Sequence, residues 1–140
     1  DIGCVYQQFD AVPMLDKVSH FLSGFVFTTL GVCIYLWLRR KEENPVGRSP
    51  VTGVAFGVFF SSFVGVFWEI CEFLGFVIGG HDSQHHLTTG VFDTMYDLIN
   101  CFVGSLICAA SLLLYFHKKI KLPSGAVVDD FLQVLKKGRD

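Results

Sequence analysis

Glu69 and Glu72 lie three residues apart inside an otherwise apolar stretch that runs from Val51 to Gly80. At this spacing both side chains share one face of a helix. A carboxylate inside a bilayer costs about 2.5 to 3.5 kcal/mol on insertion scales, so such a residue normally faces a protein partner or a wet cavity. The pair therefore predicts either a functional site or a polar contact between helices, for example with Trp68 or Asn100.

Two further pairs of ionisable residues have helical spacing: Asp16 with His20, and Asp93 with Asp97. Carboxylates gathered at close range stay ionised only if cations join them. Carboxylates with one histidine suit Zn, Mn or Fe, and carboxylates with water suit Mg. We therefore predict a divalent metal ion, its identity open, bound by His20, Glu69, Glu72, Asp93 and Asp97.

A bound divalent cation would activate water for hydrolysis, and Glu72 and Asp93 are the candidate catalytic carboxylates. Two alternatives remain open. In the first, the acids act as a relay or ion site in a proton- or cation-conducting unit. In the second, the chain is a small accessory subunit whose acids bind the basic helix of a partner. The expected partners are membrane lipids and either further copies of the chain or a larger membrane assembly, with no nucleic acid.

The elements that carry these residues are predicted to be membrane helices. Hydrophobic residues make up 51% of the 140 residues, and the mean hydropathy is +0.49. Three uncharged runs approach the roughly 20 residues that span a bilayer. They are Phe21–Leu38, Val51–Trp68 and Leu98–Phe116. We predict an all-α polytopic membrane protein with an exterior lead-in over residues 1–13, a three-helix transmembrane domain over 14–117, and a cytoplasmic amphipathic tail over 118–140.

The basic residues predict the orientation of these helices. Of eleven Lys and Arg residues, ten lie between positions 39 and 50 or after Phe116, and Lys17 is the exception. The positive-inside rule places those two regions in the cytoplasm, with the N-terminus and the 80–92 loop outside. All three acidic groups then lie at one depth near the outer face. Because a site there opens at the outer interface, we expect a lipid-linked or cell-envelope substrate.

Helix signals refine these ranges. The first helix is predicted from about Met14 to Arg40, the second from Val51 to Ile78, and the third from near Val91. Small residues should let helices approach closely, and Asn100 is expected to serve packing too. Those small residues are Gly24, Gly31 and Gly104. Ser124 is a candidate cap for the tail helix, which is expected at the membrane surface. In the exterior loop, solvation is favoured over metal binding for His81, His85 and His86.

Between Asp16 and Ala110, the motifs that contain Asp16 and His20, Glu69 and Glu72, and Asp93 and Asp97 resemble those of the YjdF-type membrane proteins. These proteins are relatives of the VanZ-like superfamily. The resemblance implies a bacterial or archaeal plasma-membrane protein whose acidic and histidine positions gather near one membrane face. VanZ-like members are associated with glycopeptide resistance and the cell envelope. Members usually carry further helices before the Asp-x-x-x-His motif, so this chain is expected to be a shortened member or one piece of a larger assembly. The segments that carry the resemblance are Asp16-Lys17-x-x-His20-Phe21-x-x-Gly24-Phe25, Trp68-Glu69-Ile70-x-Glu72-Phe73, and Asp93-Thr94-x-x-Asp97-Leu98 followed by Gly104.

Overall fold

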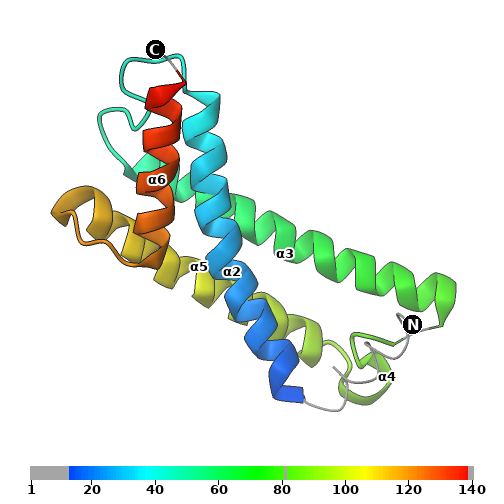
Figure 1. Ribbon diagram of the computed structural model, residues 1–140. Helices are drawn as coiled ribbons and strands as arrows, with labels where there is room; N and C mark the ends of the chain where they lie inside the picture. The colour runs from blue at the N-terminus through cyan, green and yellow to red at the C-terminus, as the bar shows by residue number, and fades with distance from the viewer. Residues whose placement is uncertain (1–12, 81, 139–140) are drawn as a thin grey trace.

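The computed structural model describes residues 13–80 and 82–138, and within these ranges the chain forms helices and turns without a strand (Figure 1). The all-α prediction is confirmed. Three of the helices are long and apolar enough to cross a membrane. The predicted lead-in lies outside the described residues except for Pro13. The helices are α2 (Pro13–Leu38), α3 (Val51–Gly79), α4 (His86–Thr89), α5 (Phe92–Lys118) and α6 (Pro123–Lys137).

The ends of α3 are marked by local sequence signals. Pro50 precedes its first residue. Because proline lacks a backbone N–H, it cannot donate to the carbonyl four residues earlier, so the helix does not continue toward the N-terminus beyond Pro50. At the other end, Gly80 adopts a left-handed conformation with φ 69°, and its N–H donates to the carbonyl of Phe76. Glycine reaches this conformation without steric cost, so the helix stops there. These bounds lie within one residue of the predicted range.

Glycines allow α2 and α5 to meet backbone to backbone, as predicted. A Cβ atom on Gly24 would lie 2.0 Å from the carbonyl oxygen of Cys101. A Cβ atom on Gly104 would lie 2.1 Å from the carbonyl oxygen of Phe21. Neither distance is compatible with a side chain, so only glycine permits this crossing. Gly31 makes a similar approach to α3, where its Cβ would lie 2.8 Å from the Cα of Gly57.

Hydroxyl groups join all three long helices at the same level. The Gly24 carbonyl in α2 accepts hydrogen bonds from Thr28 of its own helix at 2.8 Å and from Ser61 of α3 at 3.0 Å. Ser105 of α5 donates to the Ser61 hydroxyl at 2.9 Å. These groups are buried, and each finds its partner inside the bundle, which is what an apolar surrounding requires. The crossing point is therefore held by polar contacts as well as by close packing.

The amphipathic tail helix α6 packs against its own chain, beside α2 and α5 (Figure 1). Val128 is 0% exposed and joins the core near Leu36 and Leu112. The prediction that Ser124 caps α6 is wrong, since the cap position is Leu122. The Ser124 hydroxyl instead lies buried, 2.7 Å from the hydroxyl of Ser111 in α5. The apolar face of α6 thus contributes to the fold.

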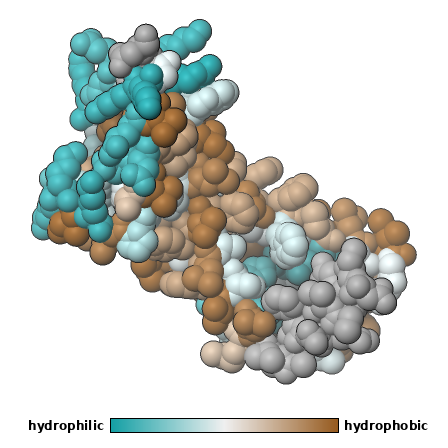
Figure 2. All heavy atoms as spheres, viewed as in Figure 1, coloured by the Kyte–Doolittle hydropathy of each residue, from teal (hydrophilic) through white to brown (hydrophobic). Residues whose placement is uncertain are grey.

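The surface of the bundle is apolar over its middle and hydrophilic at the end where α6 and the α2–α3 turn lie (Figure 2). Large apolar side chains are exposed along α3, among them Phe59 at 75%. The last turns of α3 lie apart from the beginnings of α2 and α5 (Figure 1). A Cβ atom on Gly75 would have no neighbour within 4 Å. An apolar surface of this extent fits a lipid surrounding.

Candidate functional site

The first turns of α2 and α5 bring ionisable side chains together at one end of the bundle. Asp16, Lys17 and His20 come from α2, and Asp93 and Asp97 come from α5. Residues four apart share a helix face, so each helix presents its acids on the side that packs against the other. The close crossing at Gly24 brings the two faces within contact distance.

Lys17 is the centre of this cluster. Its ammonium donates to Asp93 Oδ1 at 2.6 Å, to Asp97 Oδ1 and Oδ2 at 2.7 and 2.8 Å, and to Asp16 Oδ2 at 3.0 Å. The ammonium thus contacts three carboxylates from two helices. Counted without His20, the three carboxylates and the one ammonium give a formal net charge of −2. The cluster therefore retains an attraction for cations.

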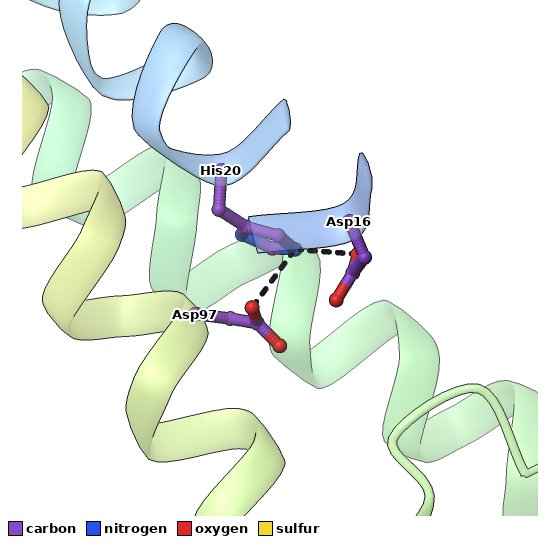
Figure 3. Close-up of side chains that lie close together, drawn as sticks. All are labelled: Asp16, His20 and Asp97. Atoms are coloured by element: carbon purple, nitrogen blue, oxygen red, sulfur yellow. Dashed lines mark ion pairs between the residues drawn. The ribbon is translucent and has the colours of Figure 1, made fainter. Parts of the chain in front are cut away.

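His20 lies between Asp16 and Asp97 (Figure 3). Its Nε2 is 3.5 Å from Asp16 Oδ1 and 4.0 Å from Asp97 Oδ1. One ligand atom from each of these residues lies within 4.8 Å of the other two. His20 is 7% exposed and Asp97 is 2% exposed, whereas Asp16 is half-buried. Two of the three potential ligands are thus held inside the protein.

These separations fit a small divalent cation. Nitrogen and oxygen ligands lie about 2.0 to 2.2 Å from Zn²⁺, so two ligands of one ion are at most about 4.4 Å apart. The two distances from His20 Nε2 are below that limit, and the ligand atoms of Asp16 and Asp97 lie within 4.8 Å of each other. A cation bound there would share Asp16 and Asp97 with the ammonium of Lys17. The donor set of two carboxylates and an imidazole is one that Zn, Mn and Fe accept.

Glu69 is buried in α3, with 5% of its surface exposed. Its Oε2 accepts a hydrogen bond of 3.0 Å from Gln84 Nε2, which also lies 3.0 Å from the Glu69 carbonyl. Its Oε1 has no hydrogen-bond partner among the described residues. Gln84 therefore ties the α3–α5 connection to the helix, and one buried carboxylate oxygen remains available.

The other predicted ligands have different surroundings. Asp93 joins the cluster through Lys17. Glu72 is only half-buried and accepts a hydrogen bond of 3.0 Å from Trp68 Nε1, one turn back on α3. This is the contact with Trp68 that the sequence predicts as the alternative to a functional site. The group formed by Asp16, His20 and Asp97 therefore contains two of the five predicted ligands, His20 and Asp97.

The comparisons with known proteins agree with a membrane protein. A family model described as Predicted membrane protein (DUF2238) matches residues 2–119. The chain belongs to this family. The DUF2238 match covers all three long helices and ends at residue 119, directly after α5 and before α6. It supports an integral membrane protein, and the resemblance to YjdF-type and VanZ-like proteins stays a prediction. No curated protein and no solved structure matches the chain.

Two participants were missed in the sequence. Lys17 is absent from the predicted site, yet a lone lysine next to Asp16 at the acidic end is the signal for an internal counterion. Asp16 is predicted to lie near the outer face with the other acids, but it is not among the five predicted metal ligands. Loop histidines 85 and 86 do not belong to the group formed by His20, Asp16 and Asp97, and His81 lies outside the described residues. The side chain of Asn100 donates to the Tyr96 carbonyl in its own helix.

Proposed function

We propose that this membrane protein binds a divalent metal ion through Asp16, His20 and Asp97, with Glu69 as a further ligand, and modifies a lipid-linked or cell-envelope substrate. The observation that carries the proposal is the approach of the three ligand atoms within 4.8 Å, with His20 and Asp97 buried. Glu69 lies outside this three-residue group, and we include it as a further ligand because its Oε1 is buried without a hydrogen-bond partner among the described residues. The resemblance to VanZ-like proteins, which we propose as a distant kinship, favours an envelope substrate.

A divalent cation bound at this position would supply Lewis-acid activation for hydrolysis or group transfer. The residues of the chain would supply position and charge. Lys17 holds Asp93 and Asp97 in place and keeps a positive charge beside the ligands. Its three N–H donors are already used by the carboxylates of Asp16, Asp93 and Asp97, so its proposed role is to hold these side chains in place. Asp93, whose side chain is 12% exposed and pairs with Lys17, is the candidate base within the cluster. Glu72 would take part only from a more distant position.

The distribution of Lys and Arg, read with the positive-inside rule, supports placing this site at the exterior face, with the C-terminus in the cytoplasm. The exposed apolar surface of α3 supports association with lipids and with further copies or other membrane subunits. Three helices enclose little volume on their own, so the proposed site would be completed by further copies of the chain or by other membrane subunits.

The experiment is metal analysis of the full chain purified in detergent. Near-stoichiometric Zn, Mn, Fe or Mg is expected in the wild type, with loss in the Asp16→Asn/Asp97→Asn variant. Glu72→Gln is the matched comparison, because it removes one carboxylate from the same end of the bundle but outside the three-residue group. A metal-free wild type that stays metal-free when titrated with these ions would contradict the proposal. Equal loss in Glu72→Gln would contradict the ligand assignment.

A second candidate function is proton or cation conduction, and the contacts of Lys17 favour it. An ammonium within 3.0 Å of three carboxylates forms a continuous set of ionisable groups at one depth, and such sets serve as relays in membrane transporters. Flux measured in proteoliposomes separates the two functions. A flux abolished by Lys17→Met in metal-free protein would favour conduction, and an absence of flux beside metal-dependent turnover would favour the enzyme.

A further inference from the structure

A cleft lies at the opposite end of the bundle, between the α2–α3 turn, the end of α5 and α6. Its volume is about 510 Å³. This is within the range of roughly 300 to 1,000 Å³ that small-molecule sites occupy. Phe116 and Leu132 form part of an apolar wall, and Lys119 and Lys136 lie on the lining as well. The cleft is therefore amphipathic, with positive charges beside apolar surface.

The acidic residues of the lining compensate these charges only in part. Asp129 accepts a hydrogen bond of 2.5 Å from Lys121 and one of 2.7 Å from the Tyr115 hydroxyl. The hydrogen bond from Lys121 is the main cause, and the one from Tyr115 the second cause, of a pKa of Asp129 below its ordinary value. The negative charge of Asp129 is therefore already matched by Lys121. Among the described residues, Lys119 and Lys136 form no ion pair. Glu43 is the remaining acid on the lining.

The surroundings of the cleft are strongly basic. Residues 39–50 and 117–137 contain nine Lys and Arg against four Asp and Glu. The Lys119 ammonium lies 5.5 Å from the centre of the Tyr115 ring, a cation–π contact that holds it at the end of α5. An anion that enters the cleft would therefore meet two ammonium groups that pair with no described acid, in a positive field.

The limits of the apolar helices place the cleft at the membrane boundary. The three candidate spans end at Leu38, begin at Val51 and end at Lys118 on this side of the bundle. All three limits adjoin the segments that line the cleft. A ligand there would have its polar part in water and its apolar part against Phe116 and Leu132. Phospholipids have this division, and anionic headgroups bind basic pockets at the ends of membrane helices.

We propose that this cleft binds the headgroup of an anionic phospholipid, with Lys119 and Lys136 contacting the phosphodiester and the lipid backbone lying against Phe116 and Leu132. The site is separate from the acidic cluster at the other end of the bundle, so it stands independently of the proposed metal function. The predicted orientation agrees with it, because the cytoplasmic leaflet carries the anionic lipids.

The test is a titration of the full chain in detergent with short-chain phosphatidylglycerol, with phosphatidylcholine of the same chain length as the comparison. Saturable binding of phosphatidylglycerol is expected, together with a weakening of about fivefold for each lysine replaced by glutamine. Lys119→Gln/Lys136→Gln is compared with Lys41→Gln/Lys137→Gln, which removes the same charge from exposed positions at the same end, outside the lining. Lys136→Gln alone gives a second reading that leaves the end of α5 intact.

Three outcomes would overturn the proposal. Equal weakening in both double variants would indicate a diffuse charge effect without a specific cleft. Equal affinity for phosphatidylcholine would remove the role of the anionic headgroup. Displacement of the lipid by millimolar inorganic phosphate, with no dependence on the acyl chains, would assign the cleft to a soluble anion. Retention of binding in the control and loss in the cleft variant would support the assignment.

Discussion

Replacement of Lys17 by methionine tests the charge balance of the acidic cluster most directly. Methionine keeps the length and apolar stem of the side chain but removes the ammonium, which leaves three carboxylates without their cation. Removing one partner of a buried ion pair costs about 3 to 5 kcal/mol. Because the Lys17 side chain is 24% exposed while that of Asp97 is 3% exposed, we expect a loss near the lower end, about 3 kcal/mol.

A loss of this size should lower the Tm by about 10 °C for a chain of this length. Thermal unfolding in detergent, followed by the fluorescence of the two tryptophans, measures it. Lys41→Met is the control, because Lys41 is exposed in the α2–α3 turn. Equal Tm values for the two variants would refute the reasoning.

The substitution Asp93→Asn is expected to change the stability in opposite directions in the wild type and in the Lys17→Met variant. In the wild type, Asp93→Asn removes the negative charge that pairs with Lys17 and should destabilise the protein. In the Lys17→Met background it removes an uncompensated negative charge and should stabilise it. An Asp93→Asn effect of the same size and direction in both backgrounds would show that the two residues are not coupled.

Other predictions concern the packing and the basic end of the bundle. Gly104→Ala should destabilise the protein by about 3 kcal/mol, because its Cβ would overlap the Phe21 carbonyl. Gly75→Ala, which meets open space inside α3, should leave the Tm unchanged or raise it slightly, because alanine favours a helix over glycine. The depressed pKa of Asp129 predicts that its contribution to stability is fully present above about pH 4 and disappears as the pH falls further, when the carboxylate is protonated. A Tm difference between wild type and Asp129→Asn that stays constant from pH 7 to pH 3 would contradict this.

The architecture of the membrane helices was accessible from the sequence because it depends on local properties. Apolar run length predicted three spans, and Pro50 and Gly80 marked both ends of α3. The common depth of the acids followed from the rise of a helix per residue. The rotation of each helix about its axis is a different matter, because it depends on where helices touch. Gly24 and Gly104 suggested a contact, but which carbonyl each one meets depends on the other helix.

The composition of the candidate site was less accessible for the same reason. Glu69 and Glu72 share one helix face, yet Glu69 is buried and Glu72 pairs with Trp68, because α3 diverges from its neighbours over its last turns. Nothing local in the sequence encodes that divergence. The role of Lys17 also depends on tertiary contact, since only the approach of α5 places Asp93 and Asp97 around its ammonium. The site residues therefore remain predictions whose arrangement the structure now describes.

The hydrogen-bonded crossing at the Gly24 carbonyl divides α2 into two arms of unequal length, which would act as a lever if the helix pivoted there. His20 lies four residues, or about 6 Å, from this point on one side, and Leu36 lies twelve residues, or about 18 Å, on the other. A rigid helix held at such a pivot converts a displacement of Leu36 into an opposite displacement of His20 about one-third as large. A sideways shift of 3 Å where α6 packs would therefore move the imidazole by roughly 1 Å, comparable to the difference between a bound and a lost ligand.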